Sequence, residues 1–335
     1  MSRRFDGFCC FLDAVEREVG KQLLRGSPTY GGKMPDDWTD EDWKNLVLSI
    51  KVDQCTPFIG SGACHGILPT GKTLAGEWAT ETDYPFPDSE NLIKVAQYLA
   101  VDQRADVPRN RIVERFRKAG APDFSNPLEP HCVLADLRRP IYITTNYDDF
   151  MYRALIARAA ARGEKNFAPM REYCHWNDIV KQGTKAKIPR TPTPESPLVY
   201  HLHGTLDKPT AMVVTEDDYI DFLVAIPDSR LIPEEVKSAL SNTSLLFIGY
   251  SLEDMNFKVI LRRVTTYMQR AEGARHVSVQ IAPKAKGEPP TPAEVKRAER
   301  QRAYLTKHYG LQKVDLYWGS AADFARELAE WWAKG

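Results

Sequence analysis

The sequence has few cysteines, and none of them form the C-x-x-C pairs from which zinc ribbons are built. We therefore expect no zinc site. Adjacent Cys9 and Cys10 lie in an apolar segment and are expected to pack there. Cys64 has no neighbouring basic motif that would mark it as a reactive thiolate, so we expect it to be a small packing residue. The six cysteines are Cys9, Cys10, Cys55, Cys64, Cys132 and Cys174.

An excess of charge and a long apolar run are also missing. Lysine plus arginine and aspartate plus glutamate number 45 each, which gives no indication of a nucleic-acid partner. The basic residues between Lys181 and Arg190 have no interleaved aromatics, so we expect a solvated loop there. No apolar run approaches the roughly 20 residues that span a bilayer, and no cleavable leader is recognisable. We expect a cytoplasmic protein that binds neither membrane nor nucleic acid directly.

What the sequence does contain is an alternation of short apolar runs with helical periodicity. Such alternation predicts an α/β fold: a doubly wound parallel Rossmann-like sheet with helical insertions. Ligands of such sheets bind beyond the carboxyl ends of the strands. The expected strands cover residues 57–59, 141–144, 198–203, 212–215, 245–248, 277–281 and 314–317.

The helical segments suggest how the chain is organised. Residues 7–24 carry apolar side chains at helical spacing and are followed by Gly31-Gly32, so residues 1–36 are expected to form an N-terminal helical arm that packs either on its own domain or on another subunit. Residues 37–335 are expected to form the α/β domain. Within it we expect a helical insertion at about 83–137 and an irregular loop or lid at about 163–197.

The glycine-rich segment after the first strand supports two interpretations. Gly66-x-x-x-x-Gly71-Lys72-Thr73 matches the P-loop pattern. However, six residues, Gly60 to His65, separate Ile59 from Gly66, and no strand ends in the acidic residue of a Walker B motif. The alternative places the ligand loop earlier, at Gly60-Ser61-Gly62, where glycines allow the backbone to approach a diphosphate.

Four segments, in the same chain order, resemble the sirtuin-like superfamily. Gly60-Ser61-Gly62-Ala63 is similar to its G-A-G-x loop, with serine in place of the usual alanine. Thr144-Thr145-Asn146-Tyr147-Asp148 is similar to T-x-N-x-D, and Leu202-His203-Gly204-Thr205 is similar to the segment H-G-[ST]. Gly249-Tyr250-Ser251 is similar to the late G-[ST]-S loop, from which the tyrosine departs.

The resemblance is closest to bacterial sirtuin-like proteins of antiphage defence, of the Thoeris and HerA-associated type. Residues 249–257 fit the G-Y-S-x-x-D-x-N-F segment of that branch. The resemblance implies an enzyme, an NAD+ hydrolase (NADase) that releases nicotinamide and ADP-ribose and thereby depletes NAD. It also implies a homo-oligomer and a possible partner protein such as a HerA-type ATPase. The alternatives are a non-catalytic NAD- or ADP-ribose-binding regulatory subunit, a P-loop nucleotide-binding protein and a protein deacylase, the last disfavoured by the missing zinc module.

The same resemblance implies the site residues. Catalysis would fall to Asn146, Asp148 and His203, since breaking the nicotinamide–ribose bond calls for polar groups around a developing oxocarbenium ion. We expect no metal, because His201-x-His203 has no further ligands near it in the sequence, and only a minor part for His65 or His201. Binding of NAD as substrate, with no other cofactor, is implied for Gly60, Ser61, Gly62, Ala63, Thr145, Gly249, Ser251, Gly319 and Ser320.

Overall fold

The predicted parallel sheet is present and has seven strands in the order β3-β4-β2-β1-β5-β6-β7. Every pairing in it is parallel. From β1 the chain passes to β2, then to the edge strand β3, and back to β4, which lies between β2 and β3. It then crosses to the other side of β1 as β5, so the topological switch point lies between β1 and β5. The strands are β1 (Cys55–Ile59), β2 (Ile141–Thr144), β3 (Met170–Tyr173), β4 (Leu198–His201), β5 (Ser244–Ile248), β6 (His276–Gln280) and β7 (Val314–Trp318).

The structure is a computed structural model that describes residues 38–177, 186–225, 231–252, 258–259, 261, 275–282 and 291–335. These residues belong to one compact unit, Asp37–Gly335. The expected N-terminal arm and the helix expected near Asp254 lie outside the described residues. No helix in the described part of the chain has both the length and the apolar character needed to cross a membrane.

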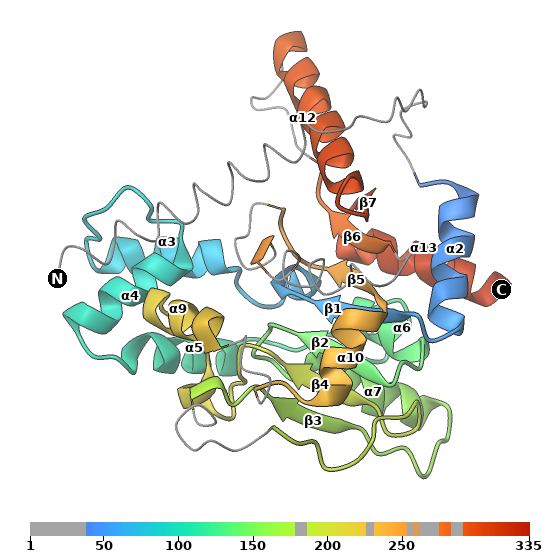
Figure 1. The fold of residues 1–335 in the computed structure, drawn as a ribbon. Coiled ribbons are helices and arrows are strands. Elements are labelled where there is room, and N and C mark those ends of the chain that lie inside the picture. Colours follow the sequence, from blue (N-terminus) through green and yellow to red (C-terminus); the bar gives the residue numbers. More distant parts are fainter. Residues whose placement is uncertain are drawn as a thin grey trace. The chain divides into compact units, whose positions relative to one another are not determined.

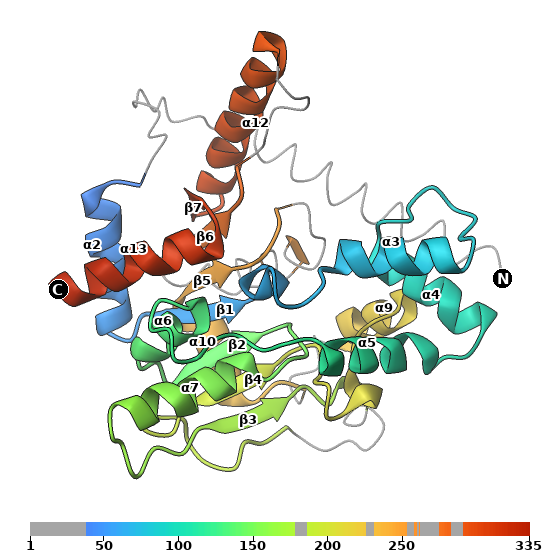
Figure 2. The same ribbon diagram turned by 180° about the vertical axis from the view of Figure 1, so that it is seen from behind.

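Helices cover both faces of the sheet because successive side chains of its buried strands point to opposite faces. Ile59 and Tyr142 pack on one face with α2 (Asp40–Lys51), α6 (Pro130–Asp136), α7 (Phe150–Ala161) and α13 (Ala321–Lys334). Phe58 and Ile143 pack on the other face with α10 (Glu234–Asn242) and α12 (Pro292–Gly310). The first view has α10 in front of the sheet (Figure 1), and the reverse view has α6 and α7 in front (Figure 2).

Three helices between β1 and β2 form a separate cluster with its own core. They are α3 (Gly71–Glu81), α4 (Leu92–Asp102) and α5 (Val107–Lys118), and they pack together with Met212 and Val214. A largely buried ion pair between Arg109 and Asp218 joins α5 to α9 (Glu216–Ala225). The cluster lies beside one end of the sheet, next to α9 (Figure 1). The fourth helix of this stretch, α6, packs on the sheet instead.

Two sequence-based expectations about strands are wrong. Residues 163–197 are not wholly irregular, because Met170–Tyr173 forms the edge strand β3. Only Met170 of this strand is buried, so it has no apolar run by which to recognise it. The segment 212–215 is not a strand. It follows the short 3₁₀ helix Pro209–Ala211 and is joined to the loop after β4 by the hydrogen bond from Val213 N–H to His203 O.

Candidate functional site

The loops that follow four neighbouring strands, β4, β2, β1 and β5, meet at the carboxyl edge of the sheet. They carry His203, Thr145–Asp148, Gly60–Cys64 and Gly249–Ser251 in that order across the sheet. This is the edge where doubly wound sheets bind ligands, and it includes the switch point. Most of the sequence-predicted site residues therefore lie in one place.

The loops after β1 and β5 pack backbone against backbone. Gly60 N–H donates to Ile248 O at 2.8 Å, and Gly62 N–H donates to Gly249 O at 2.9 Å. A Cβ on Gly60 would lie 2.7 Å from Gly249 O and 2.8 Å from Cε2 of Tyr250. Gly249 has a φ of +82°, which L side chains rarely adopt. Both glycines are therefore required by the packing of these loops, whatever ligand binds here.

Tyr250, which departs from the family pattern, ties three loops together. Its hydroxyl donates to Ile59 O at 3.0 Å and shares a 2.7 Å hydrogen bond with the Thr145 hydroxyl. The ring packs edge-on against Phe58, with the centroids 5.5 Å apart. The Thr145 hydroxyl therefore has a structural partner. The next residue, Ser251, is exposed.

Asn146 and Asp148 follow β2 and are both buried. The Asn146 amide nitrogen donates to Gly60 O at 3.1 Å and to Cys64 Sγ at 3.5 Å. Asp148 accepts the Phe150 N–H at the start of α7 at 3.0 Å, which is the helix-terminal role that any aspartate in such a turn can play. Its second oxygen accepts from the Cys64 thiol at 3.5 Å. The asparagine and the aspartate thus meet at one sulfur atom.

His203 lies just beyond β4, which ends at His201. The expectation that one strand, 198–203, holds both histidines is therefore wrong. The His203 ring is buried edge-on against Phe222, with the centroids 5.0 Å apart. Its Nε2 is buried with no hydrogen-bond partner among the residues that the structure describes. Burial lowers the pKa of His203 from 6.5 to about 4, so the ring is neutral near pH 7.

His201 has a different role from His203. Its Nδ1 donates to the backbone carbonyl of Asn146 at 2.8 Å, because a carbonyl oxygen can only accept. Burial lowers the pKa of His201 as well. This histidine therefore fixes the backbone of the loop after β2. His65, by contrast, is exposed.

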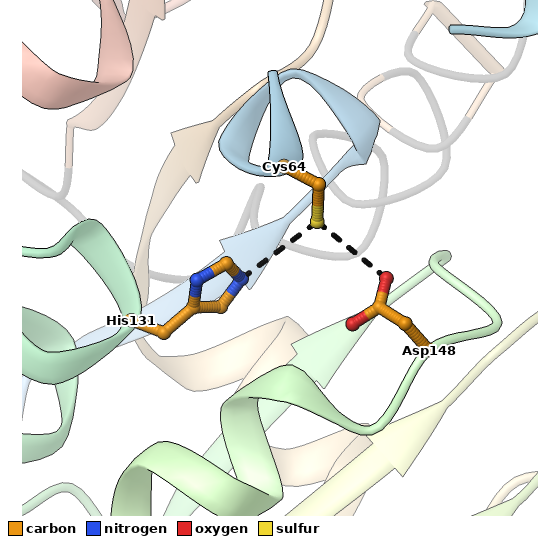
Figure 3. A group of neighbouring side chains, drawn as sticks. All are labelled: Cys64, His131 and Asp148. Atoms are coloured by element: carbon orange, nitrogen blue, oxygen red, sulfur yellow. Dashed lines mark hydrogen bonds between the residues drawn. The ribbon is translucent and has the colours of Figure 1, made fainter. Parts of the chain in front are cut away.

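Sequence reasoning missed two residues of this site, His131 and Glu129, and underestimated Cys64. Cys64 lies between His131 and Asp148, with its sulfur 4.0 Å from His131 Nε2 (Figure 3). His131 Nδ1 is 2.7 Å from a Glu129 oxygen. Burial, followed by the nearby Asp148 charge, raises the pKa of the Cys64 thiol well above its usual value, so Cys64 is a protonated thiol and not a nucleophile. Because Cys64 is 67 residues from His131 and 84 from Asp148, local spacing gave no indication of the group.

This group also has the donor atoms of a metal site. Atoms of Cys64, His131 and Asp148 all lie within 4.8 Å of one another, and all three residues are buried. Sulfur, imidazole nitrogen and carboxylate oxygen together suit zinc and related ions. The sequence-based expectation of no metal considered only the His201–His203 pair and did not consider this set.

Two other sequence-predicted segments lie apart from the cluster around Asn146. Gly319 and Ser320 follow β7, three strands from β1, which is about 14 Å at the usual strand spacing. The Ser320 hydroxyl caps α13, where it accepts from Asp323 N–H at 3.0 Å. Lys72 of the competing P-loop pattern is exposed and pairs with Glu90 at 2.6 Å. The 3₁₀ helix Ser61–Cys64 separates β1 from Gly66, so the backbone does not have the P-loop arrangement.

These features define a doubly wound α/β protein with a polar site at its switch point. Some buried polar atoms of this site have no hydrogen-bond partner among the described residues. A family model described as "SIR2-like domain" matches residues 140–312, about half of the chain. The chain belongs to this SIR2-like family, as the sequence resemblance predicted. The matched segment includes Asn146, Asp148 and His203 but neither the loop after β1 nor His131.

Curated relatives give the same family likeness. Proteins named NAD(+) hydrolase ThsA from Acinetobacter baumannii and Enterococcus faecium are 26% and 31% identical to this chain over 230 and 221 residues. These alignments cover 67% and 65% of this chain but only 42% and 41% of the relatives, so the chain spans less than half of their length. A solved structure described as "Structural Basis for the Mechanism and Regulation of Sir2 Enzymes" aligns with a TM-score of 0.38 and 14% identity, covering 89% of this chain and 98% of that chain.

Proposed function

We propose that the protein is an NAD+ glycohydrolase that cleaves the bond between nicotinamide and ribose. The observation that carries this proposal is the convergence of Asn146 and the unpartnered His203 on the edge of the sheet that holds the Gly60 loop. Family membership and the name of the relatives, NAD(+) hydrolase, support the choice of substrate. In the reaction, water and NAD+ give nicotinamide, ADP-ribose and a proton.

The chemistry follows from the groups present. Departure of nicotinamide leaves positive charge on the ribose, and the Asp148 carboxylate stabilises that charge. The Asn146 amide binds a ribose hydroxyl or the attacking water and so orients it. His203 is neutral at pH 7 because burial lowers its pKa to about 4, so one of its two ring nitrogens can accept a hydrogen bond from water or a ribose hydroxyl. In the Gly60–Ala63 loop the amides of Gly60, Gly62 and Ala63 donate to backbone carbonyls, so the Ser61 N–H is the amide that binds the diphosphate. The adenosine half extends across Gly249 and Ser251 toward Gly319 and Ser320.

Nicotinamide release from purified protein tests the proposal. Asn146→Ala and His203→Ala should each lower kcat by about 10²-fold or more, as expected for loss of a catalytic group. His276→Asn is the matched control. His276 is also buried, but it is the first residue of β6 and so lies at the amino ends of the strands, away from the site. Its kcat should stay at the unmodified value. If either site variant releases nicotinamide at the unmodified rate, that residue has no catalytic role.

The same assay separates the alternative functions. A sensor binds NAD or ADP-ribose, which raises Tm, but releases no nicotinamide. A deacylase releases nicotinamide only when an acetylated peptide is present. We expect release without any peptide.

We also propose that the enzyme acts in the cytoplasm as an antiphage effector that depletes NAD. It would work as a homo-oligomer through residues 1–36, with a partner such as a HerA-type ATPase. The support is the sequence resemblance and the apolar stripe in residues 7–24, whose burial would contribute about 1.5–3 kcal/mol for each large side chain. Light scattering of the full chain and of a chain without residues 1–36 tests the oligomer. A monomeric full chain would contradict it.

A further inference from the structure

We propose that Glu129, His131 and Cys64 are positioning residues that hold the Asn146 amide so that its oxygen faces the substrate ribose. This inference rests on the proposed function, because it assigns Asn146 the role of hydrogen-bond acceptor in the same site. The three residues form one chain of contacts, Glu129–His131–Cys64, and the Cys64 end of it is hydrogen-bonded to Asn146 and Asp148.

The first step is the orientation of the Asn146 amide. Its nitrogen has two acceptors, Gly60 O at 3.1 Å and Cys64 Sγ at 3.5 Å, which use both amide hydrogens. Turning the amide over would place its oxygen against the Gly60 carbonyl oxygen, where neither atom can donate. The hydrogen-bond network therefore fixes the amide in one orientation.

The second step concerns the oxygen of this amide. Oδ1 has no hydrogen-bond partner among the described residues, and it is not one of their fully buried unpaired atoms. It therefore reaches the surface of the site as an acceptor. Ribose hydroxyls and water are donors, so an Asn146 held this way can bind either of them.

The third step concerns the residues that contact the Cys64 sulfur and hold it in place. Cys64 accepts from Asn146 and donates to Asp148 at 3.5 Å, so one thiol fixes both catalytic side chains. His131 Nε2 faces the same sulfur at 4.0 Å, and its Nδ1 is 2.7 Å from Glu129 Oε1. The other Glu129 oxygen accepts the Cys132 N–H of α6 at 3.0 Å. The chain is thus anchored in the backbone of a helix that packs on the sheet.

Because the arrangement is buried, it depends on which side chain stands at position 64. Cys64 and His131 are each 1% exposed. Water cannot replace a lost hydrogen bond at such a position, so removing the sulfur leaves an Asn146 hydrogen without its acceptor. Alanine would leave the space of the sulfur empty and could hold neither the Asn146 amide nor the Asp148 carboxylate. Serine would restore both the donor and the acceptor.

The experiment compares Cys64→Ala with Cys64→Ser in nicotinamide release. Cys64→Ala should lower kcat about 10-fold or more, and Cys64→Ser should stay within about 3-fold of the unmodified protein. Cys55→Ala is the matched control, because Cys55 is also a buried thiol but lies at the opposite end of β1. It should keep the unmodified kcat, even if its Tm falls as far as that of Cys64→Ala.

Glu129→Gln provides a second readout. It should lower kcat, and the double variant with Cys64→Ala should be no slower than Cys64→Ala alone, because both changes act through one chain. Equal kcat values for Cys64→Ala, Cys64→Ser and the unmodified protein would overturn the proposal. One equivalent of zinc in the purified protein, absent from Cys64→Ala, would overturn it in favour of a metal centre.

A crystal structure of Cys64→Ala keeps this inference separate from the proposed function. We expect the Asn146 side chain to leave Gly60 O or to occupy more than one rotamer. An unmoved Asn146 would overturn the positioning role. If the unmodified protein releases no nicotinamide, the proposed function fails, and the crystal structure still decides whether Cys64 positions Asn146.

Discussion

The amide nitrogen of Asn146 lies 3.1 Å from the carbonyl oxygen of Gly60, so the loop after β2 is hydrogen-bonded to the loop after β1. The loop after β1 is in turn bonded to the loop after β5, through Gly62 N–H and Gly249 O at 2.9 Å. A displacement of any of these loops is therefore transmitted to Asn146. Substitutions that touch no ligand should still change activity when they separate the loops.

Gly60→Ala is the most direct test of whether separating these loops changes activity. The added Cβ would lie 2.7 Å from Gly249 O and 2.8 Å from Tyr250, so one of these loops must move. We expect a loss of about 1–3 kcal/mol in the free energy of unfolding, as for other overpacked sites, and a larger relative loss of kcat/KM. Denaturant unfolding and nicotinamide release measure the two effects.

Gly76→Ala is the control for this substitution. Gly76 lies inside α3, and a Cβ there would meet nothing within 4 Å. Alanine should raise the free energy of unfolding by about 0.5–1 kcal/mol, because glycine is a poor helix former. A Gly60→Ala protein that is as stable and active as Gly76→Ala would contradict the close packing of the two loops.

Tyr250→Phe tests the link among three loops. The change removes one hydroxyl, which bonds to Ile59 O at 3.0 Å and to the Thr145 hydroxyl at 2.7 Å, and it leaves the ring packing unchanged. We expect a loss of about 1–2 kcal/mol in the free energy of unfolding and a raised KM for NAD. Tyr304→Phe, at an exposed position, is the control and should change neither quantity. An unchanged KM in Tyr250→Phe would show that the loops hold their positions without this hydroxyl.

The sequence predicted those parts of the fold whose cause is local. Short apolar runs predicted β2 and β5, and both strands are present. The edge strand β3 was missed, because an edge strand with one buried residue has no apolar pattern. Its pairing with β4 is decided by tertiary contacts, which override local propensity.

The same limit explains what was missed in the site. Asn146, Asp148 and His203 follow strand ends, so their convergence could be predicted from the topology of a doubly wound sheet. Cys64 and His131 meet only because α6 packs on the sheet beside the loop after β1. A lone cysteine and a lone histidine 67 residues apart have no periodicity that predicts this contact.

Lys72→Ala tests the P-loop alternative. Among the described residues Lys72 pairs with Glu90 alone, and both side chains are about two-thirds exposed, so removing the pair should change the free energy of unfolding by less than about 1 kcal/mol. We expect unchanged nicotinamide release and no magnesium-dependent rise in Tm with ATP, while ADP-ribose raises Tm. Strong protection by ATP and magnesium that is lost in Lys72→Ala would restore the P-loop hypothesis.

Stability should fall as the pH falls from about 6.5 towards 4, because buried histidines resist protonation. Burial lowers the pKa of His203 and of His276 from 6.5 to about 4. In that window the unfolded chain binds more protons than the folded chain, so the stability present above pH 6.5 is lost as the pH decreases. Each unit of pKa difference corresponds to about 1.4 kcal/mol, so each histidine contributes up to about 3 kcal/mol over the full window.

His276→Asn isolates one of these contributions. His276 Nδ1 accepts the Leu245 N–H at 3.0 Å, and an asparagine oxygen can accept the same hydrogen without titrating. Denaturant unfolding of His276→Asn between pH 7 and 4.5 should therefore show a smaller decrease in the free energy of unfolding than the unmodified protein shows. Parallel curves for His276→Asn and the unmodified protein would show that His276 is not held neutral in the folded chain.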